Sequence, residues 1–263
     1  MKGLSLLLPG SRSDGGDGTA LEVQVFPGTG AGRRPVIVFS HGHLVDPRTY
    51  FYLGMEWARR GFTVFHPQHT GPSEKIARAE NWPRRSADLL RVLKALGSRA
   101  ALGKGLADNV DPRRVGVAGH SMGAHTALLL GGAALFHPSF GREKKFRIVP
   151  EEARNVKACL VLSPPPEGKL GLRPASWRGI RCPLAIFSGS RDFRSPDGRI
   201  TGVALQKSVA RPDTRLFVFK KANHLSFINA VFKEDDGRYV QFPDFRLQGE
   251  ARRFSSQFWK DTL

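Results

Sequence analysis

A serine flanked by glycines carries the clearest chemical signal in the chain, in the stretch Gly119-His120-Ser121-Met122-Gly123. A short apolar run at residues 115–118 precedes it, and small and apolar residues from Ala124 onward predict a helix after it. The pattern G-x-S-x-G between a strand and a helix is typical of a nucleophile elbow, a tight turn that lifts the serine hydroxyl clear of the sheet. We therefore predict that Ser121 is a catalytic nucleophile. The alternative is a glycine-rich turn that carries a solvated serine.

A serine hydroxyl is a weak nucleophile unless a histidine takes its proton, and that histidine needs an orienting carboxylate. Chains that carry a nucleophile elbow place the three groups in the order serine, acid, histidine. Of the eight histidines in the sequence, only His224 follows both the elbow and a later acid at the end of a predicted strand. We predict His224 as the base and Asp192, a few residues past a strand end, as the acid. The alternatives for the acid are Asp197, in a turn sequence, and Asp213, before the last predicted strand.

Acyl transfer also needs N–H donors for the developing oxyanion, and the chain offers two candidates. The N–H of Met122 stands at the start of the predicted elbow helix, where free N–H groups and the helix dipole favour negative charge. In this arrangement the second donor comes from the loop after an earlier strand. The segment Ser40-His41-Gly42-His43 follows an apolar run at residues 36–39. We predict the N–H of His43 as the second donor, with that of Leu44 as the next choice.

Four histidines in the early part of the chain raise the alternative of a metal site: His41, His43, His66 and His69. No acidic residue or cysteine recurs beside them at the spacing of metal ligands. The chemistry of a serine, a histidine and an aspartate requires neither a metal ion nor an organic cofactor. We therefore predict no metal and no cofactor for this protein.

The elements that must position these residues follow from the hydrophobic pattern. Continuous apolar runs predict buried strands, and an alternating run predicts an edge strand with one wet face; the buried runs are 36–39, 62–65, 115–118, 156–162, 184–187 and 216–219, and the alternating run is 21–26. Helical spacing is found at residues 50–60, 85–96, 201–209 and 251–259, and after the elbow. Strands that alternate with helices predict an α/β protein whose mostly parallel central sheet has helices on both faces. Functional residues then lie beyond the carboxyl ends of the strands.

The composition fits one large domain and excludes few partners. The chain has 263 residues, and 41 Lys and Arg against 23 Asp and Glu give a formal net charge of +18. The basic residues occur as scattered pairs, and no block of five or six like charges is present. This pattern favours a generally basic surface over a groove for nucleic acid, so we expect no specific nucleic-acid partner. Peripheral contact with an anionic membrane stays open, and the oligomeric state does not follow from the sequence.

Cysteine usage and the first residues bear on the compartment. Cys159 and Cys182 each lie in or beside an apolar run, where a thiol behaves as a small buried hydrophobe, and two cysteines do not form a disulfide framework. The first ten residues hold one Lys and an apolar run shorter than that of a signal peptide. No stretch approaches the roughly 20 apolar residues of a membrane-spanning helix. We expect a cytoplasmic protein.

Several segments together resemble the α/β-hydrolase superfamily; they are residues 36–43, 52–74, 114–130, 185–196 and 222–227. Within it, the chain resembles platelet-activating-factor acetylhydrolases and bacterial predicted dienelactone hydrolases, and it shares features with chlorophyllase-like and polyester-degrading hydrolases. The resemblance implies Ser121, Asp192 and His224 as the triad, and the N–H groups of His43 and Met122 as oxyanion donors. A dienelactone hydrolase proper uses a cysteine nucleophile, so that resemblance says little about the chemistry of Ser121.

These patterns lead to one main functional hypothesis and one alternative. We expect residues 1–263 to form a single α/β-hydrolase domain, in which residues 136–154 are a candidate cap or insertion. The expected function is a serine hydrolase that cleaves a carboxylic ester, of a small molecule or a lipid, through an acyl-enzyme intermediate. The alternative is a non-catalytic member of the fold that binds a ligand or an anion.

Overall fold

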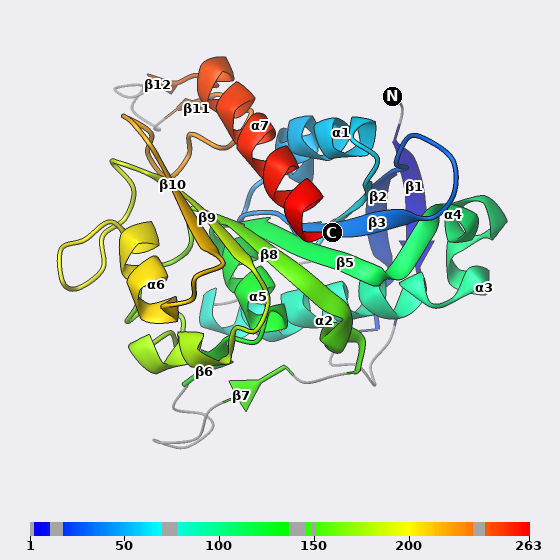
Figure 1. The fold of residues 1–263 in the computed structure, drawn as a ribbon, viewed down its shortest axis with the longest axis horizontal. Coiled ribbons are helices and arrows are strands. Elements are labelled where there is room, and N and C mark those ends of the chain that lie inside the picture. The colour runs from blue at the N-terminus through cyan, green and yellow to red at the C-terminus, as the bar shows by residue number, and fades with distance from the viewer. Residues whose placement is uncertain (1–2, 11–17, 70–77, 137–145, 149–150, 234–239) are drawn as a thin grey trace.

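A long central sheet organises the computed structural model, which describes residues 3–10, 18–69, 78–136, 146–148, 151–233 and 240–263. Within these residues the sheet has eight strands in the order β1-β2-β4-β3-β5-β8-β9-β10 (Figure 1). The strands are β1 (Leu4–Leu8), β2 (Leu21–Phe26), β3 (Arg34–Ser40), β4 (Thr63–Pro67), β5 (Val110–His120), β8 (Val156–Leu162), β9 (Leu184–Gly189) and β10 (Thr214–Phe219). Neighbours from β4 to β10 pair in parallel, whereas β1 with β2 and β2 with β4 are antiparallel. The mostly parallel sheet predicted from the sequence is confirmed.

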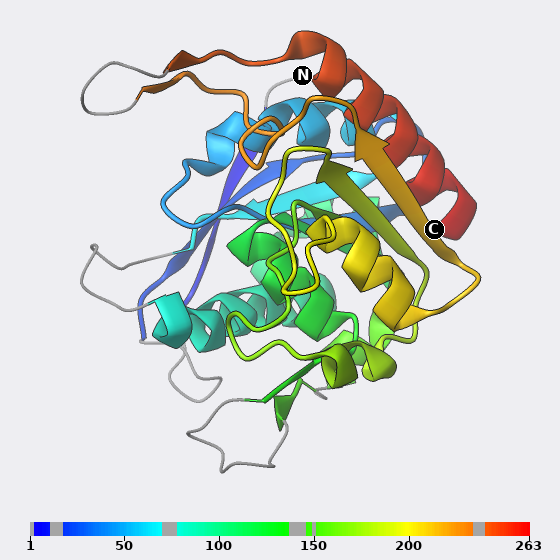
Figure 2. The same cartoon turned by 90° about the vertical axis from the view of Figure 1, so that its left-hand side faces the viewer.

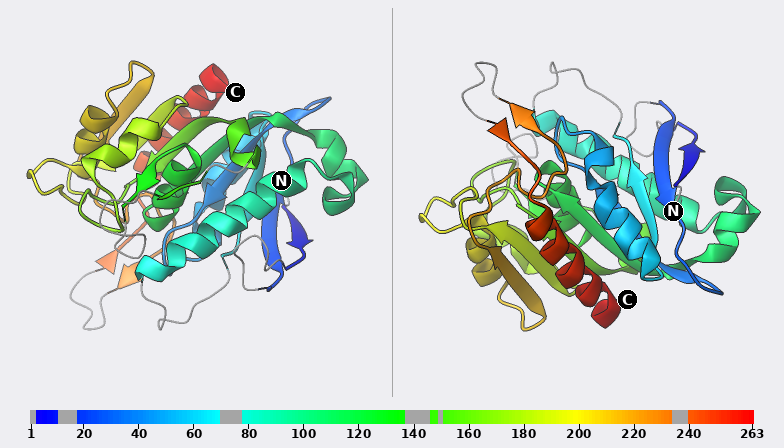
Figure 3. Two further views of the ribbon diagram at one scale, coloured as in Figure 1. Left: turned by 90° about the horizontal axis from the view of Figure 1, so that it is seen from below. Right: turned by 90° about the horizontal axis from the view of Figure 1, so that it is seen from above.

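Helices cover both faces of this sheet. One face carries α1 (Phe51–Arg59) and α7 (Phe245–Thr262), which lie in front of the sheet in the right-hand view of Figure 3. The other face carries α2 (Arg78–Leu96), α5 (Met122–Leu130) and α6 (Thr201–Val209); Figure 2 shows α5 and α6 on the side opposite α7. The short helices α3 (Arg99–Leu102) and α4 (Lys104–Asn109) lead from α2 into β5. Two further strand pairs are β6 (Ala134–Leu135) with β7 (Phe146–Arg147), and β11 (Phe232–Lys233) with β12 (Val240–Gln241).

The sheet separates two apolar layers. Side chains from α2, α5 and α6 pack on one face, and aromatic side chains from α1 and α7 pack on the other. On the second face the rings of Trp57 and Trp259 meet edge to face at 5.8 Å, and the Trp57 indole N–H donates to Ser255 Oγ at 2.8 Å. Burial of apolar surface stabilises a fold by roughly 25 cal/mol per Å². These two layers therefore stabilise the sheet, and with it the positions of the strand ends.

Both cysteines belong to the buried interior. Cys159 lies on β8 and Cys182 lies just before β9, and both are free thiols. Burial raises the pKa of Cys159 well above its usual value and that of Cys182 to about 11. Each therefore behaves as a small apolar side chain, as their sequence context predicted.

The prediction that residues 21–26 form an edge strand was wrong. The alternating run of β2 does have one wet face, with Glu22 exposed between Leu21 and Val23, which are buried. However, β2 is not an edge strand, because β1 pairs with it on one side and β4 on the other. The edge strand β1 was missed because four of its five residues are leucines, of which Leu4 and Leu7 are exposed. Its outward leucines do not produce the alternation that marks an edge strand.

Two helices begin earlier than their apolar spacing predicts. Helix α2 starts at Arg78 rather than at residue 85, and Pro83 lies inside it. Proline lacks the backbone N–H, so one hydrogen bond of the helix is missing at this position. Helix α7 starts at Phe245 rather than at residue 251, and the side chain of Asp244 caps it by accepting from Leu247 N at 2.9 Å. In both helices the first turns lack the apolar stripe from which a helix is predicted.

Two predictions concern the segment at residues 136–154 and the membrane. Residues 137–145 and 149–150 lie outside the described residues, so the cap or insertion stays a prediction. The described Ile148 and Ala153 line a groove together with Leu130, at the end of α5 away from Ser121. In the described part of the chain, no helix combines the length and the apolar character needed to cross a membrane.

Candidate active site

The turn between β5 and α5 places Ser121 at the carboxyl edge of the sheet. Its backbone has φ 54° and ψ −116°, a region that non-glycine residues rarely adopt. The glycines make this turn sterically feasible: a Cβ added at Gly119 would lie 2.2 Å from the carbonyl oxygen of Gly123. A Cβ at Gly123 would lie 1.9 Å from the carbonyl oxygen of Ser40. The elbow predicted from the sequence is therefore present, and it packs directly on the end of β3.

The structure brings the three predicted triad side chains together. His224 follows β10, and its Nε2 lies 2.9 Å from Ser121 Oγ. Its Nδ1 lies 2.9 Å from Oδ1 of Asp192, which follows β9. Adjacent parallel strands end at the same edge of the sheet, so residues far apart in sequence meet there. A serine, an imidazole and a carboxylate in one hydrogen-bonded chain have the geometry of nucleophile, general base and orienting acid.

Three hydrogen bonds fix the carboxylate of Asp192. Oδ1 accepts from His224 Nδ1 and from the N–H of Phe193 at 2.7 Å, and Oδ2 accepts from the Ser163 hydroxyl. Burial by itself raises the pKa of Asp192, but the hydrogen bonds outweigh it and hold that pKa below its usual value. An ionised Asp192 requires the proton on Nδ1 of His224. Nε2 is then left to accept the proton of Ser121.

The two other candidate acids lie in ion pairs of their own. Asp197 accepts from the N–H of Arg199 at 3.0 Å and pairs with its guanidinium at 3.2 Å. Asp213 pairs with Arg211 at 2.7 Å, before β10 begins. The structure therefore places Asp192 beside the imidazole of His224, whereas Asp197 and Asp213 pair with arginines.

Two supporting residues were not singled out from the sequence. Ser163, which holds Asp192, directly follows β8 and precedes three consecutive prolines. Its position as a polar residue just past a buried strand was the available signal. His120 is buried beside the elbow, and Nε2 and Nδ1 lie 2.8 Å from the carbonyl oxygen of His224 and from Tyr50 Oη. Burial lowers the pKa of His120 to about 3, so its neutral ring donates to His224 and accepts from Tyr50. The structure thus assigns it to holding the backbone of the predicted base.

An aromatic ring covers the predicted base. The ring of Phe193 lies 4.2 Å from that of His224, centroid to centroid, with an angle of 34° between their planes. Phe193 is 51% exposed, so its outer face is open to solvent and to any bound molecule. The contact restricts rotation of the imidazole and shields one of its faces from water.

The predicted oxyanion loop packs against the elbow. This loop, residues Ser40–His43, leaves β3 where Gly123 touches the carbonyl oxygen of Ser40. Met122 is the first residue of α5, where N–H groups have no partner within the helix. Leu44, the second choice for a donor, has a positive φ of 56° and an exposed side chain. The segments that carry the N–H groups of His43 and Met122 are therefore in contact, and their role as donors stays a prediction.

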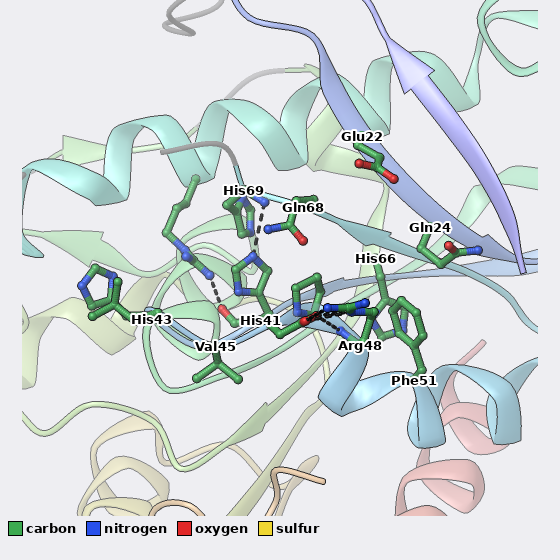
Figure 4. A pocket seen from close by; sticks show the side chains of 14 residues that line it. Glu22, Gln24, His41, His43, Val45, Arg48, Phe51, His66, Gln68 and His69 are labelled. Atoms are coloured by element: carbon green, nitrogen blue, oxygen red, sulfur yellow. Dashed lines mark hydrogen bonds and ion pairs between the residues drawn. The ribbon is translucent and has the colours of Figure 1, made fainter. Parts of the chain in front are cut away.

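A cavity of about 730 Å³ lies on the outer side of this loop (Figure 4). Its described lining includes His43, Leu44 and Phe51, together with the polar side chains of Gln24 and Gln68. Ser121 is not part of that lining, so the cavity adjoins the predicted oxyanion donor instead of covering the nucleophile.

The early histidines do not form a metal site in the residues that the structure describes, where no three His, Cys, Asp or Glu side chains gather in a suitable cluster. His41 bonds within its own loop, with Nδ1 at 2.8 Å from the carbonyl oxygen of Gly42. His66 lies among the rings of Phe26, Phe39 and Phe51. The rings of His41 and His66 are buried, and burial lowers the pKa of both, so they are neutral.

No model of a protein family matches this chain, and no curated protein sequence matches it. Solved structures of an esterase from Thermogutta terrifontis, esterase 2, do resemble it. The form phosphonylated by cyclosarin gives a TM-score of 0.66 at 18% sequence identity, over 98% of this chain and 94% of that chain. The apo form gives 0.65 at 19% identity over 98% and 94%. A butyrate-bound form gives 0.61 at 20% identity over 93% and 90%. This likeness, together with the sheet order, shows that the chain has the α/β-hydrolase fold.

Proposed function

We propose that this protein is a serine hydrolase that cleaves carboxylic esters through an acyl-enzyme intermediate. The observation that carries the proposal is the unbroken chain from Ser121 Oγ through His224 to Asp192, with 2.9 Å at each of its two links. A solvated serine in a glycine-rich turn has no need of such a chain. The finer resemblance to platelet-activating-factor acetylhydrolases stays a prediction.

In the proposed reaction, Ser121 Oγ attacks the ester carbonyl carbon while His224 Nε2 takes its proton. Asp192 keeps the imidazole in the required tautomer and stabilises the imidazolium. Collapse of the tetrahedral intermediate expels the alcohol, which receives the proton from Nε2. Water, deprotonated by the same nitrogen, then attacks the acyl-enzyme, and the carboxylic acid leaves as Ser121 regains its proton.

The N–H groups of His43 and Met122 are the proposed donors to the negative oxygen of both tetrahedral intermediates. Such donors act mainly in the transition state, because the ground-state carbonyl oxygen is a weaker acceptor. Esterase 2 has been solved in butyrate-bound and propionate-bound forms and as covalent organophosphorus adducts. By analogy, we propose that this chain accepts esters of short acyl groups and reacts with organophosphorus reagents at Ser121.

The test is the rate of hydrolysis of p-nitrophenyl esters of rising acyl length by the wild type and by Ser121→Ala. We expect kcat to fall by about three to six orders of magnitude in the variant, because the covalent route is lost. A fluorophosphonate probe should label the wild type and not the variant. Ser5→Ala, which alters an exposed serine on β1, is the matched control and should keep full activity and labelling.

The alternative, a non-catalytic member of the fold that binds a ligand or an anion, makes the opposite prediction. Such a protein would show no turnover that depends on Ser121, even if it bound the esters. Equal labelling of the wild type and Ser121→Ala would place the reactive group elsewhere and refute the proposed mechanism.

A further inference from the structure

A second Ser-His-Asp chain lies inside the molecule, apart from the proposed triad. Ser40 Oγ lies 2.9 Å from His69 Nε2, and His69 Nδ1 lies 2.9 Å from Asp88 Oδ2. The connectivity is the same as in the triad, but Ser40 is completely buried at the end of β3 and lacks the exposed, strained position of Ser121. A substrate cannot reach it, so its function must differ from that of a nucleophile.

The buried chain holds the oxyanion loop. The N–H of His69 donates to His41 Nε2 at 3.3 Å, which Figure 4 draws as a dashed line, and the two rings lie 4.9 Å apart. His41 in turn donates from Nδ1 to the carbonyl oxygen of Gly42. From helix α2, the guanidinium of Arg85 donates to the carbonyl oxygen of His41. The peptide units on either side of Gly42 are therefore held from two directions.

The direction of each proton in the chain follows from its neighbours. Burial, and then the positive charge of Arg85, lower the pKa of His69 and of His41 well below the usual value, so both rings are neutral. Asp88 also pairs with Arg91 at 3.5 Å, which favours its ionised form. Nδ1 of His69 then donates to Asp88, and its Nε2 accepts from the Ser40 hydroxyl. Each group in the chain is satisfied in one arrangement only, which makes the chain rigid.

We propose that His69 and Asp88 are positioning residues that hold the loop from Ser40 to His43, so that the N–H of His43 points at the oxyanion. The inference rests on the proposed function, because an oxyanion exists only if esters are cleaved at Ser121. Two parts of the fold that take no part in the triad, α2 and the segment after β4, thereby contribute to catalysis through the backbone that they hold in place.

Such a role has a distinct kinetic signature. An oxyanion donor stabilises the transition state more than the bound substrate, so misplacing it lowers kcat and leaves KM nearly unchanged. It also acts on oxygen more than on sulfur, which is a weak hydrogen-bond acceptor. A thionoester, whose carbonyl oxygen is replaced by sulfur, should therefore benefit less from a well-placed donor than the matching ester.

The experiment compares the wild type, His69→Phe and Ser40→Ala on an ester and its thionoester of the same acyl and alcohol groups. In His69→Phe we expect kcat on the ester to fall about 10-fold to 100-fold, with KM within twofold and a loss of less than about threefold on the thionoester. Ser40→Ala removes only a hydroxyl, so it remains testable if His69→Phe does not fold, and we expect a smaller loss with the same preference for oxygen.

The matched control is His66→Phe, the same substitution at another buried histidine, which forms no hydrogen bond with the loop. It should leave the ratio of ester to thionoester rates unchanged. Equal losses on both substrates in His69→Phe and Ser40→Ala, or no loss on either, would overturn the positioning role while leaving Ser121 as the nucleophile. Undiminished turnover by Ser121→Ala would instead refute the proposed function itself, so the two failures are distinguishable.

Discussion

At the scale of single residues, two serines in this chain face a histidine that faces an aspartate, and their surroundings separate them. Ser121 stands on a strained turn at the edge of the sheet, whereas Ser40, the last residue of β3, is buried against Arg85 of α2. We propose that these three groups carry out the reaction at Ser121 and hold the oxyanion loop in place at Ser40. Hydrogen-bond connectivity alone does not identify a nucleophile; accessibility and backbone conformation decide.

The acid of the triad gives a sharp prediction at this scale. Asp192→Asn should lower kcat by about three to four orders of magnitude, because an amide no longer requires the proton on Nδ1 of His224. Asp197→Asn is the matched control, since its carboxylate pairs with Arg199 near the surface, and it should stay within twofold of the wild type. Steady-state kinetics of the two variants on one ester is the measurement. A larger loss in Asp197→Asn would make our assignment of the acid wrong.

The three predicted triad residues could be picked out from the sequence because each follows an apolar run that forms a strand. Ser121, Asp192 and His224 all stand just past a strand end, where parallel topology gathers side chains. Their supports were not predicted. Ser163 and His120 act through contacts with residues 29 and 104 positions away, and no local pattern encodes such a pairing.

At the scale of elements, the elbow depends on how closely α5 approaches β3. The contact is made by backbone atoms alone, since Gly123 lies against the carbonyl oxygen of Ser40. The oxyanion loop and the nucleophile are thus built on one shared contact, and any displacement of α5 moves both.

Gly123→Ala tests that contact. The added methyl group would meet backbone at 1.9 Å, so we expect the free energy of unfolding to fall by more than about 2 kcal/mol and kcat to fall with it. Gly105→Ala in α4 is the control, because an added Cβ there meets no atom within 4 Å. It should raise stability by up to about 1 kcal/mol through helix propensity. Denaturant unfolding measures the free energy of unfolding of both variants. An unchanged free energy of unfolding in Gly123→Ala would contradict the packing described.

Elements with a clear hydrophobic pattern were predictable, whereas elements and element ends without such a pattern were not. The ranges of β8 and α6 agree with the apolar runs that predicted them, because β8 is buried on both faces of the sheet and α6 packs one apolar face against it. The edge strand β1 was missed because its outward leucines hide the alternation, and the first turn of α7 depends on a side-chain cap at Asp244. Such ends are set by individual hydrogen bonds and by pairing partners far along the chain.

At the scale of the whole molecule, buried histidines make the fold sensitive to acid. In the described part of the chain, five are buried: His41, His66, His69, His120 and His125. Burial lowers the pKa of His66 and His120 to about 3 and that of His125 to about 4. Unfolding restores a pKa near 6.5, so the unfolded chain binds more protons below that pH. Stability is therefore fully present above about pH 6.5 and falls as the pH drops below it.

His66→Phe isolates one part of this effect. Both ring nitrogens of His66 are buried without a partner among three phenylalanine rings, so a phenylalanine should fit. We expect the variant to exceed the wild type in free energy of unfolding, by a margin that grows about 1.4 kcal/mol per pH unit between pH 6.5 and pH 4. Urea unfolding across that range is the measurement. A margin that stays constant with pH would show that His66 titrates normally in the folded state.

The net charge of +18 gives a second prediction for the whole molecule. If the basic surface attracts substrate, kcat/KM for an anionic ester should fall as salt rises, because charges beyond about 8 Å are screened near physiological ionic strength. The value for a neutral ester of the same acyl group should stay constant. Salt titrations of both substrates give the test, and parallel curves would leave the charge without a role in substrate capture.

The two buried thiols, Cys159 and Cys182, can report on conformational opening of the protein. An alkylating reagent attacks a thiolate only during excursions that expose it, so its rate counts those excursions. Cys159 sits on β8 between β5 and β9, and its modification requires the central strands to part. Cys182 precedes β9 and needs only a local opening to be reached. The alkylation rates of the two cysteines, measured by mass spectrometry on one sample, would therefore distinguish local opening just before β9 from separation of the central strands. No label has to be introduced.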